Sequence, residues 1–237
     1  MGAFRACERA SSETEEDNVG GMIPLSDASR QPANFPAMTT AIIAANAVVF
    51  VMELIGGDAF VTHWAEIPAT ITAGHRWITI LTAMFMHAGW MHIIGNMVFL
   101  WAFGPEVEDA MGPPLYLVFY LLSGLAASLA QLALMPHSTV PNLGASGAIA
   151  GVMGAFLVTY PHDEIRTVLL LGWFTRITFI PAVLLIGLWF LIQLFSQVGA
   201  VANAQGGGGV AYAAHVGGFI FGAVTARLFE RFQPISK

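Results

Sequence analysis

Four long stretches of this chain carry no Asp, Glu, Lys or Arg. They cover 31–52, 77–105, 110–162 and 177–226 of the 237 residues. A helix needs about 20 apolar residues to cross the roughly 30 Å of bilayer hydrocarbon, so the first two stretches can each hold one span and the last two can each hold two. Only 10% of the residues are charged, against about 25% in soluble domains. This composition excludes a soluble globular enzyme, a disordered chain and a nucleic-acid binder with a basic face.

Turn-forming residues divide the two longest stretches. Residues 136–142 interrupt the third stretch, and a run of Asn, Gln and Gly at 203–209 interrupts the fourth. Lipid offers no hydrogen bonds, so only helices or closed barrels cross it, and these apolar runs are too long and uniform for barrel strands. The sequence therefore predicts an all-α polytopic membrane protein with six helices. The expected spans are 39–57, 91–104, 115–135, 146–160, 177–198 and 211–228.

Basic residues predict the orientation of this bundle, because cytoplasmic segments are enriched in Lys and Arg. If the N-terminus is inside, the only basic residue on the outer side is Arg76. The inner segments then hold Arg5, Arg9, Arg30, Arg166, Arg176, Arg227, Arg231 and Lys237. We therefore expect a multi-pass integral membrane protein with both termini in the cytoplasm.

The N-terminal part has neither the apolar core of a signal peptide nor the acid-poor composition of a transit peptide. This favours a bacterial inner (plasma) membrane. The predicted organisation is a polar, solvated cytoplasmic tail at 1–35, a six-helix membrane domain at 36–230 and a short cytoplasmic tail at 231–237. The first loop, about 58–90, mixes aromatic, histidine and charged residues, so we expect it to be partly interfacial and to lie on the outer leaflet.

Ionisable and strongly polar residues inside a bilayer are costly and indicate function. His92 and Asn96 lie in the second expected span, Ser146 begins the fourth and His215 lies in the sixth. These three spans run in the same direction, so their polar residues share the outer half of the membrane. The fourth span is only roughly 22 Å long at 1.5 Å per residue, so its start is expected below the surface, in a pocket open to water.

Residue spacing brings two of these side chains together. Ser146, Ala150 and Gly154 form one small-residue face, and His215, Gly218 and Gly222 form another. Packing these faces would place the serine hydroxyl beside the imidazole, as a nucleophile and base require. No carboxylate lies in either span, so the pattern predicts a Ser–His dyad. His92, Asn96 and the Ser146 backbone amide could stabilise an oxyanion.

Four short motifs follow one another in the same region. They are His87-Ala-Gly-Trp-Met-His92-Ile-Ile-Gly-Asn96-Met, Phe103-Gly104-Pro-Glu106-Val-Glu108-Asp-Ala-Met-Gly112, Gly144-Ala145-Ser146-Gly147 and Ala214-His215-Val-Gly-Gly218-x-x-x-Gly222. In content and order they resemble the motifs of the rhomboid intramembrane serine proteases, and the resemblance covers about 40–228. It implies a six-helix rhomboid-like bundle in which span five and the loop before span six help to admit substrate.

The resemblance also implies roles for individual residues. Ser146 would be the nucleophile and His215 the general base, with His92, Asn96 and the Ser146 amide as oxyanion stabilisers. The substrates would be other membrane proteins cut near the outer end of a transmembrane segment, without metal or cofactor. Ala150 stands where some members place an aromatic ring that stacks on the histidine. Arg76-Trp77 stands upstream of the place where many members have Trp-Arg.

Other interpretations stay open at this stage. A histidine metal site is disfavoured because His87 and His92 are five residues apart, without a cluster of Cys or carboxylates. The single cysteine, Cys7, excludes a disulfide within the chain. The main alternative is a non-proteolytic rhomboid-like protein that binds membrane clients, and a channel or transporter is a third option. Glu106 and Glu108 are expected to brace the inner end of the second span, and His87 to hold the first loop.

Overall fold

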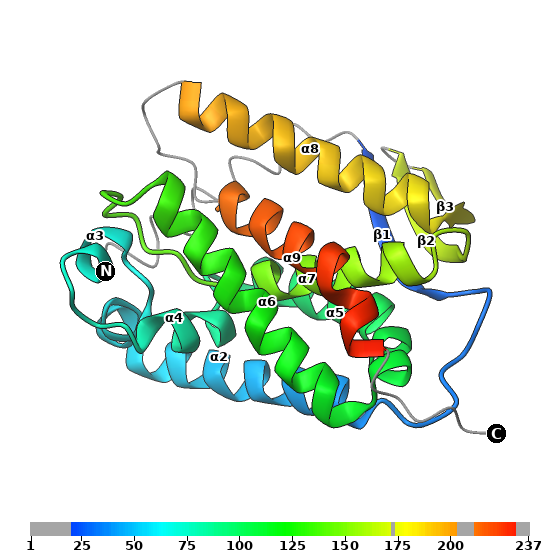
Figure 1. Ribbon diagram of the computed structural model, residues 1–237, viewed down its shortest axis with the longest axis horizontal. Coiled ribbons are helices and arrows are strands. Elements are labelled where there is room, and N and C mark those ends of the chain that lie inside the picture. Colours follow the sequence, from blue (N-terminus) through cyan, green and yellow to red (C-terminus); the bar gives the residue numbers. More distant parts are fainter. Residues whose placement is uncertain (1–19, 172–173, 203–210, 231–237) are drawn as a thin grey trace.

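The computed structural model describes residues 20–171, 174–202 and 211–230, and helices make up most of this part of the chain (Figure 1). The first half contains β1 (Gly20–Asp27), α2 (Ala37–Trp64), α3 (Pro68–Thr72), α4 (Thr79–Thr82), η1 (Ala83–Phe85), α5 (Trp90–Met111) and α6 (Pro113–Leu134). The second half contains α7 (Ser146–Thr159), β2 (Glu164–Leu171), β3 (Phe174–Pro181), α8 (Ala182–Ala202) and α9 (Tyr212–Glu230).

Each of the six expected spans corresponds to a helix, but fewer of these helices have the length and hydropathy of a bilayer span. Within the described residues, α2 and α6 meet both criteria, and a third candidate arises if α4–η1 and α5, bent by 88°, are counted as one span. Ser146–Thr159 and Ala182–Val198 are shorter apolar helices. By these criteria the fold has two or three candidate spans, so a six-span arrangement remains a prediction.

Helix α7 lies at the centre of the bundle and packs against α5, α6 and α9 (Figure 1). A Cβ atom added to Gly218 would lie 2.0 Å from the Gly147 carbonyl oxygen, and one added to Gly222 would lie 1.9 Å from that of Gly151. Helices α7 and α9 are therefore in backbone contact, which only residues without a side chain allow. The predicted small face of α9 is confirmed. On α7 the predicted Gly154 also lies against the α9 backbone, and Gly147 and Gly151 make the remaining close contacts.

The prediction of an all-helical chain is wrong in one region, because β1, β2 and β3 form an antiparallel sheet in that order. Strand β3 contains residues expected at the start of the span 177–198, so the helix begins only at Ala182. Strand β1 lies within the segment expected to be a solvated tail. The sheet has a buried side, since Ile165 and Thr167 in β2 are fully buried, and this burial stabilises pairing between segments far apart in sequence.

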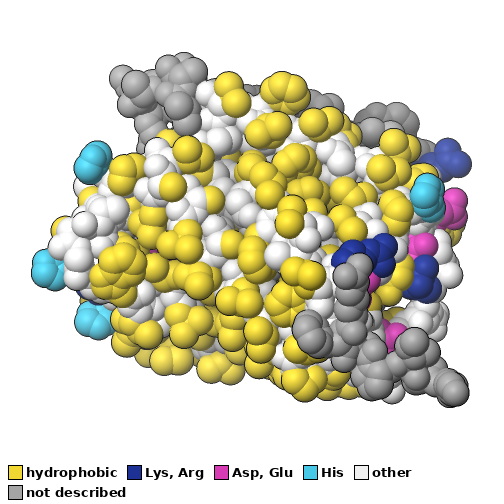
Figure 2. All heavy atoms as spheres, in the orientation of Figure 1, with side chains coloured by type: hydrophobic (Ala, Val, Ile, Leu, Met, Phe, Trp, Pro, Cys, Tyr) yellow, Lys and Arg dark blue, Asp and Glu magenta, His cyan; other side chains and the backbone are white. Residues whose placement is uncertain are grey.

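Charge and hydrophobicity are separated along the long axis of the molecule. Figure 2 shows basic and acidic side chains at the end where Figure 1 shows the sheet, while hydrophobic side chains cover the middle of the visible face. Exposed residues such as Leu188 on α8 and Leu129 on α6 contribute to the apolar surface. A lipid environment accounts for so much exposed apolar surface between polar ends.

Ion pairs and buried carboxylates hold the sheet end together. The Arg30 guanidinium contacts Asp163 and lies 3.9 Å above the Tyr160 ring. Hydrogen bonding to Arg30 lowers the pKa of Asp163. Burial raises the pKa of Asp27 to about 6, although the backbone N–H groups of Ser29 and Arg30 donate to this carboxylate. The segment after β1 is therefore anchored to the start of β2.

Glu108 stabilises a different helix end from the one the sequence suggested. Its carboxylate, near the end of α5, accepts hydrogen bonds from the Met38 N–H at 2.8 Å and from the Thr39 N–H and hydroxyl at 2.7 Å each. These amides belong to the first turn of α2, where N–H groups lack partners within the helix. The Glu108 side chain therefore caps α2 instead of the inner end of its own helix.

Candidate active site

The candidate nucleophile lies at the first position of α7. Gly144, two residues before it, has φ 138°, and a Cβ at this position would come within 2.9 Å of His92 Nε2. Glycine is therefore required both by the backbone conformation and by the close approach of the histidine. As the first helical residue, Ser146 has a backbone N–H that has no acceptor within the helix. Its hydroxyl and amide are both positioned by the start of α7.

The serine is paired with the histidine that the sequence predicted. His215 Nε2 lies 2.7 Å from Ser146 Oγ, across the close contact between α7 and α9. His215 Nδ1 lies 2.7 Å from Oε1 of Gln193 on α8. An amide oxygen can only accept a hydrogen bond, so Nδ1 carries the ring proton and Nε2 is free to accept the serine proton. This is the tautomer that a general base needs.

Two residues of α8 hold the histidine ring, and neither was predicted from the sequence. Gln193 provides the acceptor for Nδ1, and the Trp189 ring lies 5.8 Å from the imidazole between centroids, tilted by 38°. The two are four residues apart, on one face of the helix. They support the imidazole ring in a chain whose Ala150 has no aromatic ring to stack on it. An amide inside an otherwise apolar span was the available signal for Gln193.

His92 and Asn96 both lie on α5 and line the same cavity. The Ala88 N–H donates to His92 Nδ1 at 3.2 Å, so the proton of the neutral ring is on Nε2, which faces Gly144. One Asn96 amide hydrogen is bonded to the His92 carbonyl oxygen at 3.0 Å, and its second hydrogen remains as a donor. These groups are suited to stabilising negative charge near Ser146 Oγ.

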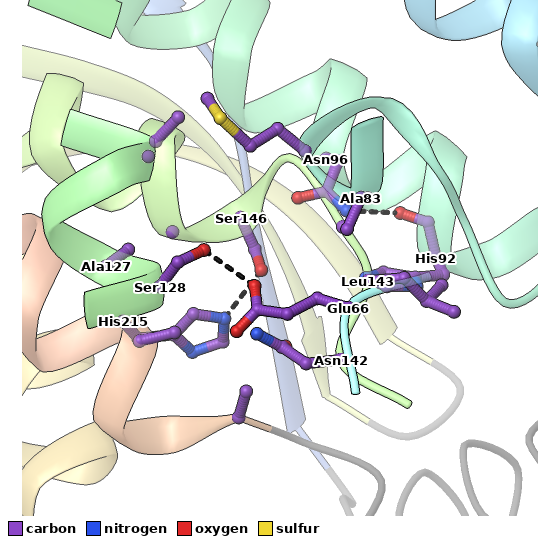
Figure 3. A pocket seen from close by; sticks show the side chains of 18 of the residues that line it. Glu66, Ala83, His92, Asn96, Ala127, Ser128, Asn142, Leu143, Ser146 and His215 are labelled. Carbon is purple, nitrogen blue, oxygen red and sulfur yellow. Dashed lines mark hydrogen bonds between the residues drawn. The ribbon is translucent and has the colours of Figure 1, made fainter. Parts of the chain in front are cut away.

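The four predicted residues share a cavity of about 270 Å³. Figure 3 shows His215 and Ser146 on one side of it and His92 and Asn96 on another, with the Glu66 side chain between them. Its polar lining residues include Glu66, His92, Asn96, Ser128, Asn142, Ser146 and His215. The structure thus brings all the predicted site residues together and adds polar residues from the first loop, α6 and the loop before α7.

Glu66 was expected to be part of an interfacial loop, but it is buried in the cavity wall. Its backbone exchanges two hydrogen bonds with Asn142, of 2.7 and 3.1 Å. Its Oε2 accepts a 2.7 Å hydrogen bond from the Ser128 hydroxyl. Burial raises the pKa of the Glu66 carboxyl. Sequence pattern gave no signal for this residue, because its position depends on how the first loop folds back onto 136–145.

His87 was expected to form hydrogen bonds within the first loop, but the contacts found join this residue to α2 and α5. Its backbone N–H donates to both oxygens of Glu53, at 3.1 and 3.0 Å, and its ring lies 5.2 Å from that of His92. Glu53 lies on α2, so this contact fixes the end of the first loop against that helix.

Within the described part of the chain, no group of three or more His, Cys, Asp or Glu side chains is arranged to hold a metal ion.

A bundle of mostly apolar helices with a Ser–His pair in a shared cavity defines an integral membrane protein with the groups of a serine hydrolase. Residues 74–232 match the family model described as Rhomboid domain. The matched segment contains all four predicted site residues and most of the helical bundle. The chain belongs to the rhomboid family, whose members are integral membrane proteins.

Curated relatives come from bacteria and from organelles. The chain is 30% identical over 196 residues to Rhomboid protease GluP of Bacillus subtilis, covering 81% of this chain and 34% of the relative. It is 30% identical over 167 residues to Rhomboid-like protein 11, chloroplastic, of Arabidopsis thaliana, which covers 68% of this chain and 55% of the relative. It is 32% identical over 155 residues to Rhomboid protein 1, mitochondrial, of Saccharomyces cerevisiae, which covers 62% of this chain and 40% of the relative. The aligned regions thus span between a third and a little over half of these relatives.

Proposed function

We propose that this protein is an intramembrane serine endopeptidase that cleaves transmembrane segments of other membrane proteins. The observation that carries the proposal is the 2.7 Å contact between Ser146 Oγ and His215 Nε2, with the imidazole held by Gln193 in the tautomer a base requires. Membership of the rhomboid family supports it, because a relative such as Rhomboid protease GluP carries that activity in its name. A rhomboid-like protein that only binds membrane clients would not need this Ser–His pair.

The first half of the reaction forms an acyl-enzyme. His215 Nε2 takes the hydroxyl proton as Ser146 Oγ attacks the substrate carbonyl carbon, and the carbonyl oxygen becomes an oxyanion. Hydrogen bonds from His92 Nε2–H, the free Asn96 hydrogen and the Ser146 N–H stabilise this charge. The peptide C–N bond then breaks, and the imidazolium gives its proton to the leaving amine.

The second half releases the product. Water attacks the acyl carbon as His215 Nε2 takes one of its protons, and a second oxyanion forms in the same place. The C–Oγ bond breaks, and the imidazolium returns the proton to the serine. No metal or cofactor takes part in this proposal. The reaction needs water below the membrane surface, and the cavity beside Ser146 provides a place for it.

We also propose the membrane arrangement predicted from sequence: six spans, both termini in the cytoplasm, the first loop in the outer leaflet and the cavity open outward. A bacterial inner membrane is the proposed location. Charge supports this orientation, since the sheet end holds Arg30, Arg166 and Arg176, and cytoplasmic segments are enriched in basic residues. Blocking engineered cysteines in sealed vesicles with an impermeant reagent would test which end faces outward.

Incubation of the purified protein with a panel of single-span membrane proteins tests the activity. Mass spectrometry of the products should map a cut near the outer end of the transmembrane segment. Because the nucleophile and base act as a unit, Ser146→Ala and His215→Ala should each reduce cleavage at least about 10⁴-fold without loss of folded protein. A Ser146→Ala protein that cleaves at the full rate would refute the assignment. A wild-type protein that binds these clients but never cuts them would favour the non-proteolytic alternative.

A further inference from the structure

The three-stranded sheet has two apolar faces, and only one of them is buried. Residues opposite one another in neighbouring antiparallel strands lie on the same face, and successive residues alternate between faces. Ile165 and Thr167 lie on one face and are fully buried. Val168 lies on the other face, opposite Ile23 of β1 and Ile177 of β3, which are 36% and 50% exposed. A row of apolar β-branched residues therefore crosses the face that the bundle does not cover.

Further side chains extend this row into a patch. Phe179 is opposite Arg166, and Leu170 is two residues from Val168 on the same strand. Phe179 is 54% exposed, and Leu170 and Arg166 are exposed as well. An antiparallel sheet that faces water carries polar residues on that side, whereas a contiguous exposed apolar patch marks an interaction site. We call this surface the exposed sheet face, made of Ile23, Arg166, Val168, Leu170, Ile177 and Phe179.

The basic residues of β2 and β3 have no carboxylate partner in the part of the chain that the structure describes. Arg30 and Arg227 form salt bridges, whereas Arg166 and Arg176 are exposed and form none with a described residue. Glu164, at the start of β2, is the acidic residue on the same face as Arg166. Arginine binds phosphate through paired hydrogen bonds. Charge on these two strands therefore fits a surface of phosphate groups.

The neighbours of the sheet place it at the level of a membrane–water interface. Trp101 on α5 is 47% exposed and lines one apolar groove together with Pro24 and Leu25 of β1. Tryptophan is enriched where a membrane meets water. Strand β3 ends at Pro181, and α8 begins at the next residue with an apolar surface that includes Leu184, 62% exposed. Figure 1 shows β2 and β3 at the end of the bundle where α8 begins, so the exposed apolar surface of α8 starts where the sheet ends.

We propose that the exposed sheet face docks on the phospholipids of the leaflet at this end of the molecule. Its apolar side chains enter the boundary between headgroups and acyl chains, and Arg166 and Arg176 bind lipid phosphates. The proposal rests on the proposed membrane orientation only in naming this leaflet cytoplasmic, and it is independent of protease activity. A second copy of the chain is the other possible occupant. Lipid fits better, because a twofold contact between copies would bring their unpaired arginines together.

The test measures contact between this face and lipid in the full-length protein. Cys7→Ser removes the single native cysteine, and Ile177→Cys then carries a fluorophore on the exposed sheet face. The protein is reconstituted into vesicles of phosphatidylcholine and phosphatidylglycerol in equal amounts, with or without bromine on the acyl chains. Because apolar side chains of an interfacial element insert about 5–10 Å, brominated lipid should quench this probe by roughly half or more.

A matched label and a charge variant separate docking from general proximity to the membrane. Ala33→Cys places the same fluorophore on an exposed residue between β1 and α2, away from the sheet, and brominated lipid should quench it little. Arg166→Gln and Arg176→Gln, each combined with the label at 177, should lower the ratio of docked to undocked sheet by about fivefold per arginine. Unfolding temperatures equal to that of the parent protein show that these variants are folded.

Three results would overturn the proposal, and none of them depends on cleavage by Ser146. Equal quenching of the labels at 177 and 33 would mean that the sheet face does not enter the lipid. Full quenching in both arginine variants would mean that no phosphate is bound. A label at 177 that is shielded without quenching, and becomes exposed when the protein is diluted in the vesicles, would assign the face to a second copy of the chain.

Discussion

Two buried glutamates lie in different parts of this molecule, and they differ in the groups that hydrogen bond to them. Glu108 is 2% exposed, and its two oxygens accept three hydrogen bonds from the first turn of α2. Glu66 is 1% exposed, and its carboxylate is bonded to the side chains of Ser128 and Asn142. Glu108 is bonded to backbone groups of another helix, so its role is structural. Glu66 is held by side chains of the wall of the cavity that contains Ser146.

The same contrast extends to the neighbouring residues. At the sheet end, Arg30, Asp163 and the Tyr160 ring contact one another and anchor segments far apart in sequence. In the cavity, the Ser146 amide, the His92 Nε2–H and one Asn96 hydrogen are left available by their local bonding. Burying a polar group inside a membrane protein costs free energy. A buried polar group without a hydrogen-bond partner therefore indicates a functional site more strongly than one whose hydrogen bonds are all made.

The largest effect on stability should come from removing the structural glutamate. Glu108→Ala leaves the first amides of α2 without their acceptor and should cost about 2–4 kcal/mol of unfolding free energy. Thermal unfolding in detergent measures this. Glu66→Ala, the same change at the other glutamate, should cost less, because its partners are side chains that can rotate toward water in the cavity. Equal destabilisation by the two changes would remove the contrast between the two glutamates.

The contact between α7 and α9 provides a second way to disturb only the part of the molecule that holds the proposed catalytic pair. Gly218→Ala places a methyl group 2.0 Å from the Gly147 carbonyl oxygen, so the helices must separate and Ser146 must move relative to His215. Displacements of about 1 Å can cost roughly 100-fold in rate, and we expect a loss of that order in fluorophosphonate labelling. Gly187→Ala on α8 is the control, because a Cβ there meets nothing within 4 Å. Similar labelling of both variants would contradict this packing account.

The Gln193 hydrogen bond should have a smaller effect, confined to catalysis. Gln193→Leu removes the acceptor that fixes the His215 tautomer, and kcat should fall about 10- to 100-fold with KM nearly unchanged. Gln193→Glu keeps an acceptor in the same place and should restore most of the activity. Ile192→Ala, on the exposed side of α8, is the control. If Gln193→Glu is as poor as Gln193→Leu, the amide contributes packing rather than orientation.

The smallest expected effect is a pH dependence of stability that arises from Asp27 at the sheet end. The pKa of Asp27 is raised to about 6 from an ordinary value of 3.8, so its favourable contribution is complete below about pH 3.8 and disappears as pH rises through 6. Wild-type stability should therefore fall between pH 4 and 6.5 relative to Asp27→Asn. Asp163, whose pKa is lowered, stays ionised in this window. Unfolding temperatures of both proteins across the window measure the difference, and parallel curves would exclude a role for Asp27.

The sequence was sufficient to predict that Ser146, His215, His92 and Asn96 lie together, because polar residues stand out in charge-free helices and periodicity places them at one depth. It could not predict Gln193 or Glu66 as partners. The first depends on which face α8 turns toward α9, and the second depends on a loop that pairs with Asn142. Both are contacts between segments far apart in sequence. The local pattern marks Gln193 as a polar residue in an apolar span, but it does not show which residue is its partner.

The sequence pattern did not predict the β-sheet, for a related reason. Residues 164–181 contain Arg166 and Arg176 and then continue into an apolar run, which is also the pattern of a loop followed by a span. Strand β2 pairs with β3 nearby and with β1 more than 100 residues away, and the distant pairing has no local signal. Helix α2 similarly extends beyond its expected end, through a kink at Gly57 where φ is 60°.

The most direct test of the central claim is to locate the group that reacts with a fluorophosphonate probe. The wild-type protein, treated in detergent or in vesicles, should carry a single adduct, and peptide mapping should assign it to Ser146 Oγ. His215→Ala should abolish this adduct, while Glu66→Gln should retain it. An adduct on another serine, or labelling of Ser146 that persists at the wild-type rate in His215→Ala, would contradict the account.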